Sequence, residues 1–126
     1  MADTNKPIPI YTTSGDTGGF LQYPYLFNPV GEWIGWLTED KQVYSVHGHY
    51  VGWLNKDNRI LRRRAEDFQK LNRTPPPAPG RLLPPAIVPL PPLMAEIKYE
   101  VVDVLDEMPE LLPRLDDFAE GDDEYI

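Results

Sequence analysis

The sequence contains no cysteine, which excludes a disulfide framework and a thiolate metal site. Its two serines, Ser14 and Ser45, both lie outside the G-x-S-x-G turn of hydrolases. No apolar run is long enough for a membrane-spanning helix, so we expect no membrane insertion. Residues 1–15 also lack the apolar stretch of a signal peptide. These absences favour a soluble, cytoplasmic protein.

Acidic charge is unevenly distributed. The formal net charge is −8, but residues 1–93 hold 8 acidic and 10 basic side chains, whereas residues 94–126 hold 12 acidic and 2 basic ones. An acidic C-terminal part repels phosphate groups, which makes nucleic acid an unlikely direct partner.

Composition divides the chain into four parts. A short extension, 1–7, precedes a region rich in glycine and aromatic residues at 8–73. Much of the proline, 15 residues in all, lies in a tract at 74–93, which favours an extended polyproline linker. An acidic tail follows at 94–126.

One pattern recurs along the glycine-rich part. Its opening position is occupied by Tyr11, Phe27, Tyr44 and Leu61. A glycine follows four residues later, at Gly15, Gly31 and Gly48, and another four residues after that, at Gly19, Gly35 and Gly52. Each copy therefore predicts two short strands joined by a glycine turn. The fold class is mainly β, an antiparallel meander of repeated hairpins with turns at 13–16, 28–31 and 46–49.

The second strand of each copy predicts two apolar faces. Strict alternation places Ile34 and Trp36 on one face and Trp33, Gly35 and Leu37 on the other. It likewise separates Val51 and Trp53 from Tyr50, Gly52 and Leu54. Because an interior glycine weakens a strand, it indicates a bulge or the close approach of another chain.

So short a sheet does not easily cover two apolar faces by itself, which favours a homo-oligomer. The residues expected at its structural or oligomer contacts are Trp33, Gly35, Trp36, Gly52 and Trp53. The alternative is that the proline tract and the tail fold back over the second face.

The segments "IYTTSGDTGGFL", "LFNPVGEWIGWL" and "VYSVHGHYVGWL" resemble the hairpin units of the four-fold β-flower proteins. The resemblance implies a compact β assembly with four-fold or pseudo-four-fold arrangement, such as a tetramer, and implies no activity. A fourth unit at 60–71 opens with the pattern but lacks the turn glycine and the closing Gly-Trp. It is either a degenerate hairpin or a short helix with Phe68 and Leu71 on one side.

Two motifs invite a catalytic or metal-binding interpretation. Asp16-Thr17-Gly18 matches the triplet of aspartic proteases, but the repeat places it at the start of an ordinary strand. His47 and His49 flank a turn glycine, and two ligands do not complete a metal site in one chain. We therefore expect a protein that is not an enzyme and that has no cofactor and no metal.

A basic run holds four arginines, Arg59, Arg62, Arg63 and Arg64. It is a candidate contact for nucleic acid, an edge whose charges keep the sheet soluble, or a partner for the acidic tail of the same or a neighbouring chain.

The tail carries apolar residues at helical spacing, and Tyr99 and Val101 also suit an added strand. Its candidate docking residues are Ile97, Val101, Leu105, Leu111, Leu112, Leu115 and Phe118. Such segments bind hydrophobic grooves, and the alternative is a disordered tail that aids solubility.

The resulting hypothesis is a non-enzymatic assembly or interaction protein. Its β core would oligomerise, and its tail would dock on a neighbouring subunit or on another protein. The rival hypothesis is a module that binds carbohydrate or nucleic acid through its Gly-Trp repeats.

Overall fold

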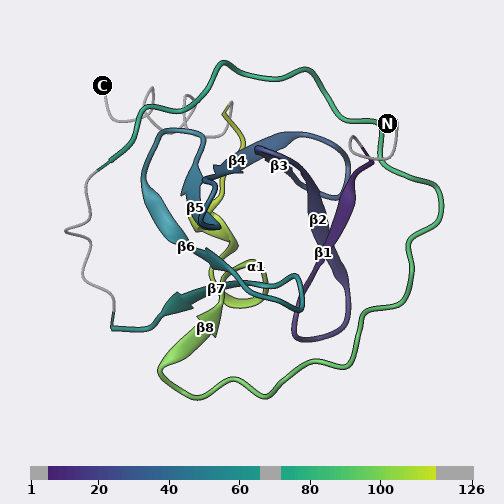
Figure 1. Ribbon diagram of the computed structural model, residues 1–126, viewed down its shortest axis with the longest axis vertical. Coiled ribbons are helices and arrows are strands. Elements are labelled where there is room, and N and C mark those ends of the chain that lie inside the picture. The colour runs from purple at the N-terminus through teal and green to yellow at the C-terminus, as the bar shows by residue number, and fades with distance from the viewer. Residues whose placement is uncertain (1–5, 66–71, 116–126) are drawn as a thin grey trace.

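The computed structural model describes residues 6–65 and 72–115. It contains one antiparallel sheet whose strands follow the chain order. The strands are β1 (Ile8–Tyr11), β2 (Thr17–Gln22), β3 (Tyr25–Phe27), β4 (Trp33–Leu37), β5 (Gln42–Ser45), β6 (Tyr50–Leu54), β7 (Ile60–Arg63) and β8 (Val101–Asp103). A short helix, α1 (Val104–Glu107), and a 3-10 turn, η2 (Pro109–Leu111), follow them. Figure 1 shows the sheet curled around these two elements. The fold is thus the mainly β, antiparallel meander that the repeat predicts.

The first three hairpins close with the same turn. Gly15, Gly31 and Gly48 have φ of +96°, +91° and +87°, a region that L side chains rarely adopt. The N–H of each glycine donates to the carbonyl three residues earlier at 2.9 Å. A Thr, Asn or Ser at that earlier position also accepts a backbone N–H through its side chain. The predicted turns at 13–16, 28–31 and 46–49 are confirmed.

The predicted alternation of faces is wrong, because each repeat contains a β-bulge. Leu26 pairs with Gly35 while Phe27 pairs with Trp33, so Ile34 is an extra residue in its strand. Ile34 and Leu37 therefore both lie in the inner core, whereas Trp33 packs with the outer cluster around Phe27.

The third repeat behaves in the same way. Val43 pairs with Gly52 and Tyr44 with Tyr50, which makes Val51 the extra residue. Val51 and Leu54 consequently share the inner core, although strict alternation separates them.

The inner core combines one row from each repeat with side chains of the tail. Its buried members are Ile10, Leu21, Leu26, Ile34, Leu37, Val43, Val51, Leu54, Ile60, Val104 and Leu112. Gly18 stands at the bulge position that Ile34 and Val51 occupy in the other copies, and Leu105 of α1 fills the space that its missing side chain leaves. The tail is therefore part of the core of the sheet.

The fourth hairpin is built from two distant parts of the sequence. Leu61 of β7 pairs with Asp103 of β8, as Tyr44 pairs with Tyr50 in the third hairpin. This register puts Val104, which is fully buried, in the place that Val51 has one repeat earlier. Residues 64–100 replace the turn. Of the two structures left open for 60–71, residues 60–63 form a strand, and 66–71, with Phe68 and Leu71, lie outside the described residues.

The ring of strands closes through β1. In the second and third repeats the N–H of Leu37 donates to Pro24 and that of Leu54 to Lys41, at 2.8 and 3.0 Å. At the equivalent carbonyl of the fourth repeat, Asn58, the donor is the N–H of Tyr11, at 2.8 Å. β1 thus completes the fourth unit, whose own second strand, β8, is cut short.

The proline tract encircles the outside of the sheet, as the teal-to-green trace in Figure 1 shows. We call residues 72–100 the strap. Seven of its nine partly or fully covered residues recur at steps of three or six residues, which fits the three-residue period of a polyproline helix: Pro76, Pro79, Leu82, Val88, Pro91, Met94 and Ile97. The other two are Pro75 and Pro84. Leu82 and Val88 pack against the aromatic cluster of Phe20 and Phe27. Both sheet faces are therefore covered by the chain itself, which was the alternative to self-association.

Candidate functional site

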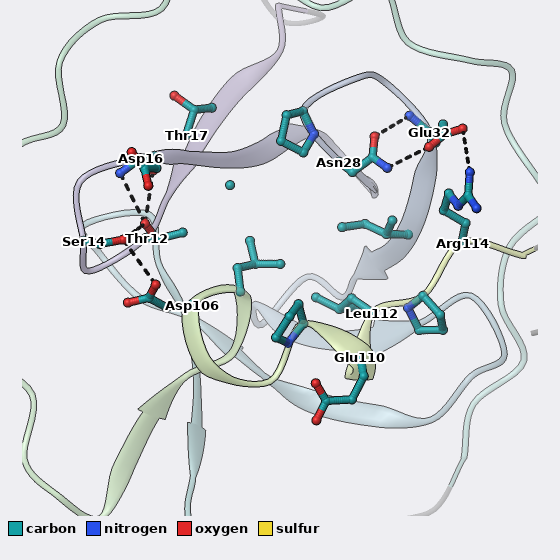
Figure 2. Close-up of a pocket in the computed structure, with 16 residues that line it drawn as sticks. Thr12, Ser14, Asp16, Thr17, Asn28, Glu32, Asp106, Glu110, Leu112 and Arg114 are labelled. Carbon is teal, nitrogen blue, oxygen red and sulfur yellow. Dashed lines mark hydrogen bonds and ion pairs between the residues drawn. The ribbon is translucent and has the colours of Figure 1, made fainter. Parts of the chain in front are cut away.

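A cavity lies between the first two hairpin turns and the tail. It measures about 770 Å³ and is open to solvent on one side. Its floor is apolar, with Ile34, Leu105 and Leu112 from the inner core. Figure 2 shows four carboxylates around this floor, from Asp16, Glu32, Asp106 and Glu110.

The polar wall is held in place by local hydrogen bonds. Asn28 donates its side-chain amide to the Glu32 carboxylate at 2.9 Å, and Arg114 approaches the other oxygen at 3.3 Å. The Asn28 hydrogen bond is the main reason why the pKa of Glu32 lies below its usual value, and Arg114 adds to the effect. Across the cavity, Ser14 donates to Asp106 at 3.2 Å. An apolar floor under a carboxylate wall suits a cationic group with an apolar body better than an anion.

The three tryptophans lie on the outer side of the sheet, near the strap or a basic residue. Trp33 donates its indole N–H to the Gly35 carbonyl at 2.7 Å and packs edge-on against Tyr25. Trp36 is buried and stacks on Tyr44, with ring centroids 4.9 Å apart. Trp53 is half-buried beneath the guanidinium of Arg63.

Gly19, Gly35 and Gly52 have one shared role. A Cβ built at each would overlap the carbonyl oxygen of the residue that opens the next repeat, which is Phe27, Tyr44 or Leu61. A neighbouring backbone does approach Gly35 and Gly52 closely, but it belongs to the adjacent strand of the same chain and not to another chain. Leu112 also reaches Gly35 from the inner side.

A family model described as the 4-fold beta flower protein matches residues 8–96. The chain belongs to this family. That membership agrees with four hairpin units closed around one axis (Figure 1). Neither the curated proteins nor the solved structures contain a match to the chain. Among the residues described, no helix is long and apolar enough to cross a membrane.

The basic run of this β-flower protein is divided between interior and surface. Arg59 and Arg62 are only 1% and 2% exposed, so their guanidinium groups are withdrawn from any nucleic acid at the surface. Arg63 and Arg64 are exposed. Arg64 stacks on Tyr99 and lies 4.0 Å from the Glu107 carboxylate. The interpretation that pairs this run with the tail of the same chain is therefore confirmed for Arg64.

The first and fourth units of the β-flower meet at a polar seam that is buried at Arg59 and Asp103 and exposed at Thr13. Arg59 donates two hydrogen bonds of 2.8 Å to Asp57 and one of 3.0 Å to the Thr13 hydroxyl. Thr13 in turn donates its N–H and its hydroxyl to Asp103, both at 2.7 Å. The Arg59 hydrogen bond is the main reason why the pKa of Asp57 lies below its usual value.

Sequence reasoning missed this seam. In the sequence, nothing distinguishes Asp57 and Asp103 from other acidic residues, or Thr13 from other turn residues. The available signal was the turn "NKDN", in which Asn55 accepts the N–H of Arg59 as Thr38 accepts that of Gln42 in the preceding linker.

The candidate docking residues of the β-flower tail have separate positions. Leu105, Leu111 and Leu112 pack in or against the inner core of their own chain. Ile97 and Val101 are half-buried, Leu115 is 44% exposed, and Phe118 lies outside the described residues. Leu105 and Leu112 also form part of the floor of the open cavity.

The motifs with a catalytic appearance have structural positions in the β-flower. Asp16-Thr17-Gly18 leads into β2, as the repeat predicts. His49 is exposed and His47 half-buried, on either side of the Gly48 turn. Within the described part of the chain, no group of three or more His, Asp or Glu side chains is placed to hold a metal ion.

The strap carries an exposed apolar row that sequence reasoning also missed. Leu83, Ile87, Leu90 and Leu93 are 88%, 86%, 90% and 100% exposed. Their spacing of three or four residues follows the outer edge of a polyproline helix, which is the signal that could have identified them. The same period turns Leu82 and Val88 inward.

Proposed function

We propose that this protein is a non-enzymatic interaction module that self-associates through the apolar row of its strap. The observation that supports the proposal is the near-complete exposure of Leu83, Ile87, Leu90 and Leu93. Exposed aliphatic side chains grouped on one edge mark interaction surfaces more often than isolated ones do.

The row is a better contact for a second copy of the chain than the rest of the surface is. Residues 82–95 contain no charged side chain, in a protein whose net charge is −8. Two copies can therefore bring these rows together without placing like charges in contact. Prolines and the contacts to the sheet hold the strap in one extended conformation, so association orders little additional chain.

The expected affinity is modest. Complete burial of an aliphatic side chain contributes ~1.5–3 kcal/mol, so the eight side chains of two facing rows give at most roughly 12–24 kcal/mol before the cost of association. That cost is ~4–15 kcal/mol, and the middle of the two ranges leaves about 8 kcal/mol, which corresponds to a Kd on the order of micromolar.

Light scattering on the full chain across concentrations tests the proposal. We expect the mass to rise above that of a monomer with concentration. The variant Leu83→Ser, Ile87→Ser, Leu90→Ser, Leu93→Ser should stay monomeric. The control is Ile8→Ser with Tyr23→Ser, two exposed apolar residues, at 45% and 56% exposure, that do not belong to the row. A full chain that is monomeric at about 100 μM, or equal association of both variants, would overturn the proposal.

A further inference from the structure

Two hairpin turns hold the strap in the same way. The N–H of Leu82 donates to the Gly31 carbonyl and that of Arg73 to the Gly48 carbonyl, both at 2.9 Å. The carbonyl of each strap residue then lies against the Cα of its glycine, where a Cβ would overlap it. Each turn glycine thus contacts one extended strap residue twice, by accepting a hydrogen bond from its N–H and by packing against its carbonyl. A side chain at the glycine position would block the second contact.

A proline follows at the same distance in both contacts. The Cδ atoms of Pro84 and Pro75 each lie 3.5 Å from the Cβ position of the glycine. Both prolines stand two residues after the residue that makes the hydrogen bond. The turn therefore binds a segment X-x-Pro, in which X supplies N–H and C=O and the proline ring rests beside the glycine.

The first hairpin has the same turn, and no segment of the described residues is bound to it. Gly15 has φ of +96° and the same hydrogen bond to the carbonyl three residues earlier. Among the described residues, no heavy atom other than its chain neighbours lies within 4 Å of its Cβ position.

The strap sequence explains the difference. Its two contacts are nine residues apart, and a further nine-residue step reaches Pro91, which has no N–H to donate. At the first unit the strap is instead held by the Tyr11 hydroxyl, which donates to the Pro89 carbonyl at 2.8 Å.

The charge beside the turn specifies the segment further. At the second hairpin, Arg81 directly precedes the bound residue and Glu32 directly follows the glycine. Glu32 and Arg81 line the same cavity, and Arg81 donates a hydrogen bond of 2.9 Å to the carbonyl of Val30, directly before the glycine. Asp16 follows Gly15 in the same way, and Asp106 lies near Ser14 of this turn.

We propose that the Gly15 turn is a docking position for an extended segment of a partner protein with the pattern basic-X-x-Pro. X pairs with the Gly15 backbone, the proline rests beside Gly15, and the basic side chain lies near Asp16. The partner copies in trans the contact that residues 81–84 make with Gly31 in cis.

The probe is the capped peptide PGRLLPPA, which has the sequence of residues 79–86. It is titrated into the isotope-labelled full chain and followed by amide chemical shifts. We expect saturating shifts centred on residues 12–16. A peptide with an N-methyl group on the leucine that corresponds to Leu82 should lose binding more than about tenfold, because its only interstrand donor is removed. A peptide with Arg81→Glu should bind more weakly.

Variants of the protein provide the matched test. Asp16→Lys changes an exposed side chain and should weaken PGRLLPPA about two- to fivefold, the size of an exposed ion pair. Gly15→Asn should abolish binding yet fold, since Asn58 already adopts a φ of +63° in an equivalent turn. Thermal melting checks that both variants are folded. The absence of saturable shifts with the unmodified peptide, or shifts centred on Gly31 or Gly48, would overturn the proposal.

Discussion

The first three hairpins and the fourth have the same register but differ in how the chain builds them. Each of the first three joins its strands through a turn of a few residues around Gly15, Gly31 or Gly48. The fourth joins β7 to β8 through a long connection, of which residues 72–100 run around the outside of the sheet. A hairpin can therefore keep its place in a ring when its turn is replaced by a long excursion.

The two kinds of hairpin differ in the chain entropy that is lost when their strands come together. Closing a short turn has a small entropy cost, so the first three hairpins can form from local sequence. The fourth requires the closure of a much longer connection, which costs more chain entropy. The stability of the ring should consequently depend on residues far from the repeats.

The largest expected effect comes from removing the second half of the fourth hairpin. Truncation after Glu100 deletes β8, Val104 and Leu112. It also removes Leu105, which fills the space beside Gly18. We expect the cooperative thermal transition to be lost, because burial of several core side chains at ~2–5 kcal/mol each exceeds the net stability of a typical domain. Circular dichroism melting measures this loss.

Truncation after Leu115 is the matched control, since it keeps every described residue of the tail. It should melt as the full chain does. If the chain ending at Glu100 melted cooperatively at the same temperature, the fourth hairpin would be dispensable and the comparison with the other three would fail.

A smaller effect tests whether the fourth unit packs on the third as the third packs on the second. Gly35→Ala and Gly52→Ala each place a Cβ on a carbonyl oxygen of the next unit, that of Tyr44 or Leu61. Because backbone rather than a flexible side chain must move, we expect each to destabilise the fold by about 3 kcal/mol.

Chemical denaturation of these variants is compared with that of Gly80→Ala, where a Cβ meets no atom within 4 Å. This control should change the unfolding free energy by less than about 0.5 kcal/mol. If Gly52→Ala lowers the unfolding free energy much less than Gly35→Ala does, the backbone of the fourth unit can move away from the added Cβ, whereas that of the third unit cannot.

The accuracy of the sequence-based predictions also differs between the three local hairpins and the fourth, non-local one. The aromatic and glycine periods predict the three local hairpins and their turns, because a turn with positive φ leaves a mark at a fixed residue. The bulge at Ile34 leaves no comparable mark, since its effect is to break the alternation on which the prediction of faces relied.

The non-local features were harder to predict. Tyr99 and Val101 suit a strand, but their partner, β7, could not be identified, because pairing across the strap depends on the path that residues 72–100 take. The cavity and the polar seam form only when the tail meets the first two turns. Neither therefore has a local sequence signature.

The smallest effect concerns the seam where the fourth unit meets the first. This seam depends on a buried ion pair between Asp57 and Arg59, and the equivalent contacts of the second and third units do not. Arg59 lowers the pKa of Asp57 in the folded state. The unfolded chain therefore binds a proton at a higher pH than the folded one does. This contribution to stability is complete above the ordinary aspartate pKa of about 3.9, and it is lost as the pH falls through the folded value.

Amide exchange at three equivalent positions resolves this seam. The N–H groups of Tyr11, Leu37 and Leu54 bond to equivalent carbonyls, and only that of Tyr11 crosses the seam. On acidification from pH 7 to pH 3, we expect the opening free energy to fall more at Tyr11 than at the other two. Asp57→Asn should lower it at Tyr11 by about 2 kcal/mol at pH 7, because Arg59 loses its charged partner while still buried, and should flatten the pH dependence. Equal loss at all three amides would mean that the ring opens as one unit, with no weak point where its two ends meet.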